Sequence, residues 1–343
     1  MRAAFLSLGL MLVAATSQAF TVEEDHLFPA TGIARARLSI LSTTDIAVLF
    51  PLIAAFQAHN PDVAVHYTVA GSQEVFGAVA NDAAAFDLVI SSAMDLQMKL
   101  VNDGFAMAHR STATAALPRW ARWQDRLFAF AQENVVTIVS RAGLGDAPLP
   151  QTRRDLIDLL RQYPERFRGR VGTYDLELSG AGYLFATQDS RQSDSFWRLA
   201  EVMGGLSPRL YVSTNEMITD LKSGNLVLAY NVLGSYARPR LADDADLQIA
   251  ELEDYTLTLL RTGFIPVTAT EPVLGGAFLD FLLSPEGQSL LQEKAGLPPI
   301  DETELAQRPH LRPMRLDPGL LVFLDDLKRQ RFLEEWRAAL LRE

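Results

Sequence analysis

The 343-residue sequence contains no cysteine. This absence excludes disulfide bonds, thiolate metal sites, iron–sulfur clusters and cysteine nucleophiles, and it also excludes the acylated cysteine that anchors a lipoprotein. Positive charge is scarce as well, because 31 Lys and Arg residues stand against 42 Asp and Glu residues and give a formal net charge of −11. No long basic run is present, so we expect no nucleic acid among the partners of this protein.

Long apolar runs are confined to the N-terminus, where residues 3–15 follow the positive charge of Arg2. That run is too short to span a bilayer, and the Ser-Gln-Ala sequence at 17–19 fits the small-x-small pattern that precedes a signal-peptidase cut. A buried N-terminal helix is the alternative interpretation. We predict a signal peptide over residues 1–19, a mature chain that begins at Phe20, and a soluble periplasmic protein without a lipid anchor.

Motifs for catalysis and metal binding are also missing. The sequence has neither the GxSxG turn of serine hydrolases nor the HExxH helix of zinc peptidases, and its histidines lack metal-ligand spacing. Those histidines are His26, His59, His66, His109 and His310. We therefore expect a protein that is not an enzyme, with no metal and no cofactor.

The sequence does contain a repeated alternation of short apolar runs and amphipathic stretches. With 48% hydrophobic and 21% charged residues the chain can bury a large core, and its length suggests two domains. The runs Ala36–Leu41, Val63–Ala70 and Phe86–Ile90 indicate strands, and each is followed by a turn and a helical pattern. This alternation predicts an α/β fold with mostly parallel sheets flanked by helices.

Hydroxyl-bearing residues follow each of these three strands, where the helices are predicted to start. They are Thr43, Thr44, Ser72, Ser91 and Ser92. Any one of them is most simply a helix N-cap. When several strand-to-helix turns lie along one sheet edge, however, their free N–H groups and positive dipole ends converge on one crevice. We therefore expect a cleft that favours a small anion or polar solute.

The second half of the chain repeats this pattern. Arg170–Tyr174 indicates a strand, and the Ser-Gly-Ala-Gly sequence at 179–182 after it lacks the full dinucleotide or phosphate-loop fingerprint. Segment 224–236 places a buried strand before Asn231 and Tyr236, at the strand end where open α/β sheets bind ligands. The alternative is that both side chains only satisfy backbone groups in a turn.

One more candidate lies in the long apolar strand Thr256–Val267, which carries a single charge, Arg261. A buried arginine normally has an anionic partner, and we expect the ligand to supply it. Strands near Val135 and Asp254 connect the two similar regions, which predicts a hinged clamp with its ligand between the lobes. The predicted division is 20–134 plus 256–300 for the first lobe and 135–255 plus 301–343 for the second.

A specific resemblance starts at residues 277–291, which read AFLDFLLSPEGQSLL. This segment resembles the signature of family 1 of the extracellular solute-binding proteins of ABC transporters, which have the two-lobed type II periplasmic-binding fold. Within that family, residues 87–104, 171–189 and 230–237 look most similar to periplasmic proteins of the phosphoglycerate transport regulatory type. Proteins of that type work with a sensor kinase.

The resemblance implies a solute-binding protein that closes its lobes on a small organic anion, possibly phosphorylated. It implies an inner-membrane ABC permease or a sensor histidine kinase as partner, and we expect a monomer. The ligand-binding residues that we predict are Thr43, Thr44, Ser72, Ser91, Ser92, Gly180, Ala181, Gly182, Tyr183, Asn231, Tyr236 and Arg261. Arg261 is included only because a buried arginine needs an anionic partner.

Ferric-ion-binding proteins are neighbours in the same family and supply the alternative function. They are marked by a tandem pair of tyrosines after the strand that corresponds to Leu226–Tyr230. In this chain Asn231, Val232 and Leu233 occupy those positions. We therefore place ferric iron second to an organic anion.

Overall fold

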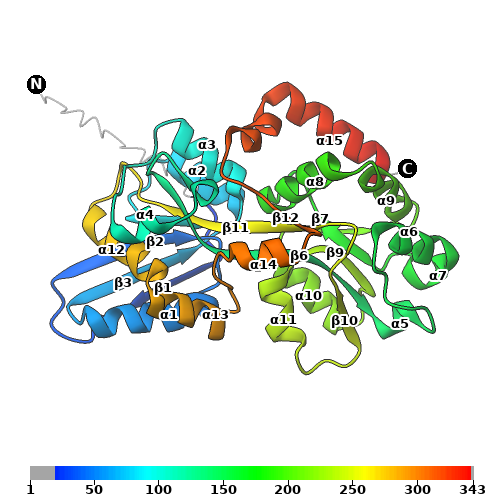
Figure 1. Cartoon of the computed structure of the whole chain (residues 1–343), viewed down its shortest axis with the longest axis horizontal. Helices are drawn as coiled ribbons and strands as arrows, with labels where there is room; N and C mark the ends of the chain where they lie inside the picture. The colour runs from blue at the N-terminus through cyan, green and yellow to red at the C-terminus, as the bar shows by residue number, and fades with distance from the viewer. Residues whose placement is uncertain (1–19, 341–343) are drawn as a thin grey trace, which may run out of the picture.

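The computed structural model describes residues 20–340, so the predicted signal peptide lies outside the described residues. Two α/β lobes lie side by side and share one twelve-stranded sheet, which helices flank (Figure 1). The predicted fold class is confirmed. No helix within residues 20–340 is both long and apolar enough to cross a membrane.

The strands follow the order β1-β3-β2-β4-β11-β6-β9-β7-β8, with β5 and β10 paired to β6 and β12 paired to β11. Their bounds are β1 Glu24–Phe28, β2 Ala36–Ser42, β3 Val63–Val69, β4 Leu88–Ser91, β5 Arg122–Trp123, β6 Leu127–Ser140, β7 Val171–Tyr174, β8 Arg209–Tyr211, β9 Leu228–Leu233, β10 Leu247–Ala250, β11 Thr256–Phe264 and β12 Leu311–Pro313. Parallel pairs β2/β3 and β2/β4 form the first lobe, and β7/β8 and β7/β9 form the second.

The helices cover both faces of this sheet. Their bounds are α1 Ile46–His59, α2 Ser72–Ala80, α3 Met94–Asn102, α4 Thr112–Ala116, η1 Arg119–Ala121, α5 Arg141–Leu144, α6 Arg153–Gln162, α7 Pro164–Phe167, α8 Gly180–Gln192, α9 Ser195–Gly204, α10 Thr214–Lys222, α11 Gly234–Leu241, α12 Pro272–Leu283, α13 Pro285–Glu293, α14 Glu302–Gln307, η2 Pro318–Leu324 and α15 Asp326–Leu340. The break between α12 and α13 falls at Ser284, which caps α13, with Pro285 at its first position.

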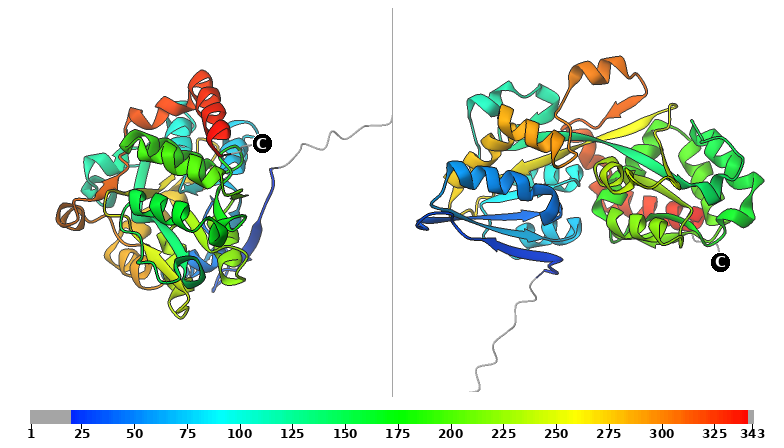
Figure 2. Two further views of the ribbon diagram at one scale, coloured as in Figure 1. Left: turned by 90° about the vertical axis from the view of Figure 1, so that its right-hand side faces the viewer. Right: turned by 90° about the horizontal axis from the view of Figure 1, so that it is seen from below.

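Strands β6 and β11 connect the lobes. They pair antiparallel over Thr258–Gly263, and the far end of β6 then pairs with β9 and β10 of the second lobe. Figure 2 shows β11, in yellow, running from one lobe toward the other. Both strands are almost wholly buried, as expected for apolar runs covered on both faces. The two connecting strands were expected from the sequence near Val135 and Asp254.

Two features differ from the sequence expectation. The first strand predicted for the mature chain starts at Ala36, but an earlier strand, β1, pairs antiparallel with β3 at the edge of the first lobe. Residues 301–343 were assigned to the second lobe, but η2 contacts α3 of the first lobe while α15 packs on α9 of the second. The predicted division into two lobes stays a prediction, and this segment crosses between them (Figure 1).

Candidate ligand-binding cleft

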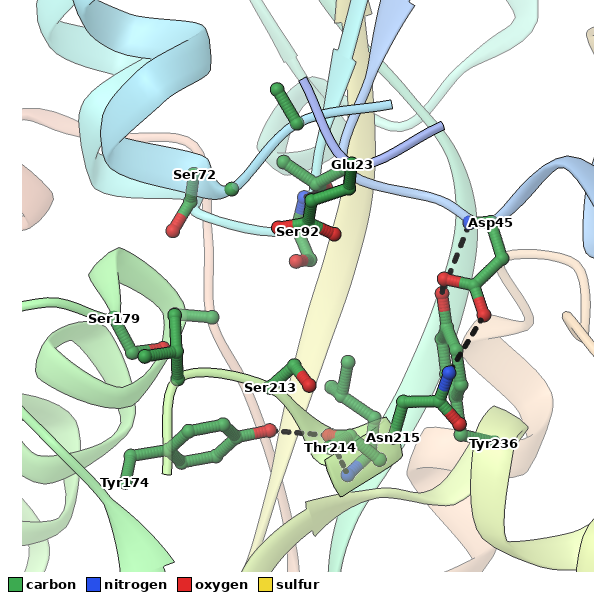
Figure 3. Close-up of a pocket in the computed structure, with 16 residues that line it drawn as sticks. Glu23, Asp45, Ser72, Ser92, Tyr174, Ser179, Ser213, Thr214, Asn215 and Tyr236 are labelled. Carbon is green, nitrogen blue, oxygen red and sulfur yellow. Dashed lines mark hydrogen bonds between the residues drawn. The ribbon is translucent and has the colours of Figure 1, made fainter. Parts of the chain in front are cut away.

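A polar cavity lies between the two lobes (Figure 3). Its lining residues are Glu23, Thr43, Asp45, Ala70, Gly71, Ser72 and Ser92 from the first lobe, and Tyr174, Ser179, Ala181, Val212, Ser213, Thr214, Asn215, Leu233 and Tyr236 from the second. The cavity volume is about 70 Å³. That is room for several water molecules, and therefore for a compact polar solute.

The N-cap residues of five helices line this cavity. They are Asp45 of α1, Gly71 of α2, Ser179 of α8, Ser213 of α10 and Leu233 of α11. Each of these helices follows a strand or turn of the sheet, so the fold brings their starts to one place. Helix starts carry unpaired N–H groups and a partial positive charge. The helix starts therefore contribute positive potential to the cavity without cationic side chains.

Hydroxyl groups of both lobes meet at the helix starts. Ser72 Oγ accepts a 2.9 Å hydrogen bond from the Gly180 N–H of α8, which joins the two lobes directly. In the first lobe, the Ser92 N–H donates to Thr43 Oγ1 at 3.2 Å. In the second, Ser179 Oγ accepts from the Gly182 N–H at 3.2 Å as the cap of α8. Because Ser72, Thr43 and Ser179 accept these bonds through their oxygens, their hydroxyl hydrogens can be donated to an anionic oxygen placed here.

Asp45 forms a second connection across the cleft. Its Oδ1 accepts a 3.0 Å hydrogen bond from the Tyr236 hydroxyl, and its Oδ2 lies 3.2 Å from Arg240 Nη2 and 3.5 Å from Asn215 Nδ2. Figure 3 shows the Tyr236 and Asn215 contacts as dashed lines. Because its three partners come from α10 and α11 of the second lobe, this carboxylate holds the lobes together.

Glu23 brings another carboxylate to the cavity, from the residue just before β1. Its backbone N–H donates to the Val69 carbonyl at 2.8 Å, which fixes the segment beside β3. Although much of the residue is exposed, burial of the carboxyl group together with the negative charges of Asp45, Glu216 and Glu24 raises the pKa of Glu23 above its ordinary value. A second negative charge is therefore unfavourable at this point unless a cation accompanies it.

Five of the predicted site residues line the cavity: Thr43, Ser72, Ser92, Ala181 and Tyr236. Gly180 does not line the cavity but donates its N–H to Ser72 Oγ. The remaining six are not among the lining residues. Whether any of the twelve contacts a ligand stays a prediction.

Four of those six residues have structural roles close to the cleft. Ser91 Oγ accepts from the Ala93 N–H at 3.1 Å and so caps the turn before α3. Gly182 lies against Tyr174, since a Cβ at Gly182 would come within 2.3 Å of the Tyr174 Cβ. The hydroxyl of Tyr183 points away and donates to the Phe323 carbonyl at 2.6 Å. Thr44 is fully buried and accepts a hydrogen bond from Arg261.

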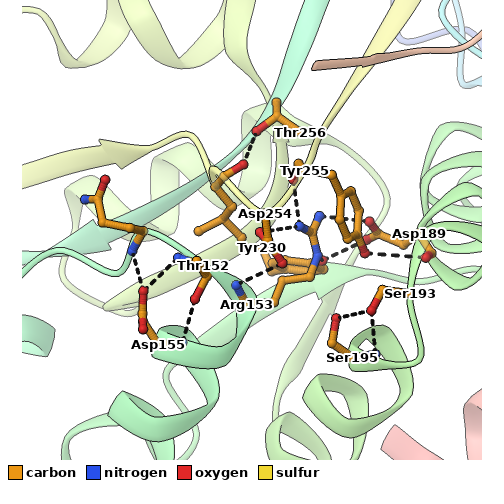
Figure 4. A network of polar contacts seen from close by, with 12 residues as sticks. Thr152, Arg153, Asp155, Asp189, Ser193, Ser195, Tyr230, Asp254, Tyr255 and Thr256 are labelled. Atoms are coloured by element: carbon orange, nitrogen blue, oxygen red, sulfur yellow. Dashed lines mark hydrogen bonds and ion pairs between the residues drawn. The ribbon is translucent and has the colours of Figure 1, made fainter. Parts of the chain in front are cut away.

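Asn231 belongs to a buried polar network of the second lobe. Its backbone is in the left-handed region, at φ 65°, and its Nδ2 donates to Asp189 Oδ2 at 2.9 Å. The same carboxylate pairs with Arg153, at 2.9 Å, and accepts from the Tyr230 hydroxyl at 2.8 Å (Figure 4). Arg153 and Asp189 are both almost fully buried. Asn231 therefore anchors β9 to this buried network and does not line the cavity.

Arg261 is buried as expected, but its anionic partner belongs to the protein. The Arg261 Nε donates to Glu133 Oε1 of β6 at 2.7 Å, and neither side chain is exposed. Arg261 also donates to Thr44, and Glu133 accepts from Ser235 of α11. The ion pair thus lies between the two connecting strands and contacts both lobes, underneath Tyr236.

Several lining residues were not among the predicted ligands. Ser179, Ser213, Thr214 and Asn215 lie at helix starts, where Ser179 and Ser213 are N-caps. Such a pattern is too common to mark a site by itself. Tyr174 ends a strand and was read as part of it. Glu23 and Asp45 were not among the predicted ligands, and only the folded chain shows that both line the cavity.

Comparisons with known proteins agree with this architecture. The model of the family of bacterial extracellular solute-binding proteins matches residues 39–297. The crystal structure of the substrate binding protein of an ABC transporter from Agrobacterium tumefaciens is similar with a TM-score of 0.89 and 33% identity, and the match covers 94% of this chain and 99% of that chain. No curated protein matches the chain.

More distant structures share the fold. AfuA, a periplasmic binding protein from Actinobacillus pleuropneumoniae with exogenous fructose-6-phosphate bound, has a TM-score of 0.72 and 17% identity, over 90% of this chain and 99% of that chain. Iron-bound HitA from Pseudomonas aeruginosa has a TM-score of 0.67 and 14% identity, over 89% of this chain and 99% of that chain. At these identities the likeness shows a shared fold and no shared ligand.

Proposed function

Because this chain belongs to the bacterial extracellular solute-binding proteins, we propose that it captures a small organic anion between its lobes and delivers it to an ABC permease. The resemblance inferred from residues 277–291 is confirmed at the level of the family. In this proposal the chain is exported with residues 1–19 as its signal peptide, and it acts as a monomer in the periplasm.

The main observation in favour of an anionic solute is the convergence of five helix N-caps on one cavity. A helix N-terminus is equivalent to roughly half a positive charge, and the hydroxyls of Ser72, Ser92 and Thr43 add hydrogen-bond donors. AfuA supports the proposal by analogy, because a protein of this fold holds a phosphorylated sugar. The negative field of a chain with net charge −11 makes such a local positive field necessary for anion capture.

Ferric iron is the second candidate, because two phenols and two carboxylates line the same cavity. Burial, the largest cause, raises the pKa of both Tyr174 and Tyr236 far above the ordinary value, so phenolate is disfavoured at both positions. The Tyr174 hydroxyl already contacts Thr214, and the Tyr236 hydroxyl donates to Asp45. Tyr230, next to the positions of the tandem tyrosines, lies in the Asp189 network. We therefore favour the organic anion.

A thermal-shift screen tests the proposal. Phosphorylated three-carbon acids, dicarboxylates and phosphonates are compared with neutral sugars, cationic polyamines and ferric citrate. An anion at one hundred times its dissociation constant should add about 2.7 kcal/mol of stability and raise the melting temperature by a few degrees. A shift with sugars or polyamines alone contradicts the proposal, and a visible phenolate-to-iron band with ferric citrate favours the second candidate.

A separate experiment identifies the membrane partner. The sequence resemblance implies either an ABC permease or a sensor histidine kinase as partner. We propose the permease, because the protein from Agrobacterium tumefaciens with 33% identity is the substrate binding protein of an ABC transporter. Uptake of the identified anion by cells with and without this chain distinguishes the two. Loss of uptake supports the permease, while normal uptake with a lost transcriptional response supports the kinase.

A further inference from the structure

The carboxylates of the cleft indicate a second charged group on the solute. Among the sixteen described lining residues there are two carboxylates, Glu23 and Asp45, and no lysine, arginine or histidine. A plain anion would gain from the helix starts but would meet two negative side chains at close range. A solute that carries both charges meets no such conflict.

The two carboxylates are not equivalent. The Asp45 carboxylate accepts hydrogen bonds from Tyr236 and Asn215 of the second lobe. It also pairs with Arg240, which balances its charge. The carboxylate of Glu23, by contrast, accepts no hydrogen bond from residues 20–340 and forms no ion pair with any of them. Figure 3 shows Glu23 in the upper part of the cavity, beside Ser92.

The position of Glu23 relative to the helix starts sets the size of the solute. Its Oε1 lies 3.4 Å from the place that a Cβ on Gly71 would occupy, so the carboxylate is next to the start of α2. Ser72 and Ser179 line the cavity at the starts of α2 and α8. The Glu23 carboxylate and the helix starts are therefore close enough to bind one molecule whose two charged groups are separated by a few heavy atoms.

We propose that the solute is a compact zwitterion, whose anionic group binds at the helix starts and whose ammonium group pairs with Glu23. This inference rests on the proposed function, which supplies the anionic group. The ammonium group would give the unpaired carboxylate a partner and relieve its repulsion by Asp45 and Glu216, a repulsion that also contributes to the raised pKa of Glu23. A solute hydroxyl could donate to Glu23, but it would not relieve the repulsion.

The test compares three phosphates that differ in one group: O-phosphoethanolamine, ethyl phosphate and 2-hydroxyethyl phosphate. Isothermal titration calorimetry measures each against the wild-type protein, Glu23→Gln and the control Glu24→Gln. Glu24 makes the control closely matched, because it is the next residue, carries the same charge and does not line the cavity.

The wild type and Glu24→Gln should bind O-phosphoethanolamine about ten- to a hundredfold more tightly than ethyl phosphate, as expected for a charge-assisted pair. Glu23→Gln should lose that preference while binding ethyl phosphate at least as well as the wild type. Equal affinities for the three phosphates in the wild type, or a preference that persists in Glu23→Gln, contradict the inference alone. Binding of none of the three, in a protein that binds a neutral sugar, contradicts the proposed function as well.

Discussion

At the scale of single residues, the ion pair of Arg261 and Glu133 shows how burial can be predicted when a role cannot. A lone charge in an apolar strand correctly indicated a buried arginine with an anionic partner. The partner, however, is 128 residues away on β6, and no pattern in the sequence connects the two. A structural partner and a ligand produce the same pattern, so only the folded chain distinguishes them.

Arg261→Ala should strongly destabilise the protein, because it leaves the carboxylate of Glu133 buried without its cation. Breaking a buried pair from one side costs about 3 to 5 kcal/mol, to be measured by urea unfolding. The double variant Arg261→Met with Glu133→Gln removes both charges and keeps an acceptor for Ser235, so it should recover much of this loss. Unfolding of Arg261→Ala at the urea concentration of the wild type would show that the pair is not structural.

A buried carboxyl group gives the stability a defined pH dependence. Burial, the largest cause, raises the pKa of Asp95 to about 7, against the partly compensating Leu96 N–H and the charge of Arg329. In the unfolded chain its pKa is about 3.9. Between roughly pH 4 and 7 the native state therefore holds a proton that the unfolded state lacks, so stability should fall as the pH rises and level off above 7.

Asp95→Asn should remove this contribution, because the amide stays neutral and can still accept from the Leu96 N–H. The gain over the wild type should be on the order of 4 kcal/mol at pH 8 and small at pH 4. Asp103→Asn, at the end of the same helix, is the control, since Asp103 is exposed and pairs with Lys99. Urea unfolding at several pH values is the measurement, and parallel curves for Asp95→Asn and the wild type would refute the assignment.

At the scale of elements, the sequence predicts helices and strands well and long-range contacts poorly. The strands around β2, β3, β4 and β9 were visible as apolar runs. The strand β1 was missed because its residues are largely exposed at an edge, which leaves no apolar run. The crossing of the C-terminal segment between lobes depends on contacts with α3 and α9 that local patterns do not encode.

The docking of α15 on α9 depends on a glycine. A Cβ at Gly204 would lie 2.3 Å from the Ala339 carbonyl oxygen and 2.9 Å from Leu340 Cα, so Gly204→Ala must displace α15. Overpacking of this kind typically costs about 1 to 3 kcal/mol. We expect Gly204→Ala to lower the melting temperature by several degrees.

The next residue provides the control for this prediction. Gly205 has a helical backbone, and a Cβ there would meet nothing closer than 3.6 Å. Gly205→Ala should therefore be neutral or slightly stabilising, because alanine restricts the unfolded chain. Equal melting temperatures for the two variants would mean that α15 does not press on Gly204.

At the scale of the whole molecule, the two-lobed fold and the position of the cleft follow from repetition. Both halves of the chain alternate strands with helices that have hydroxyl-bearing residues near their starts, and parallel strands bring those helix starts to one edge. The sequence could therefore predict Thr43, Ser72, Ser92, Ala181 and Tyr236 near the cleft, and the structure places them along it. It could not predict Glu23, whose position depends on the pairing of β1 with β3, or the role of Asp45, whose partners belong to the second lobe.

The central claim is that an anion is held by both lobes at once, at the starts of α2 and α8. Ser72 and Ala181 lie in the first turns of these helices and line the cavity. An aspartate in a first turn favours the helix, so Ser72→Asp and Ala181→Asp should stay folded while adding a negative charge to the cavity. Thr112→Asp, in the exposed first turn of α4, is the matched control.

The most direct measurement is isothermal titration calorimetry of these three variants with the anion that gives the largest thermal shift. We expect Ser72→Asp and Ala181→Asp each to weaken binding at least tenfold, a loss of about 1.4 kcal/mol or more, while Thr112→Asp binds like the wild type. Wild-type affinity in both cleft variants would contradict the account, because the anion would then bind somewhere other than between the lobes.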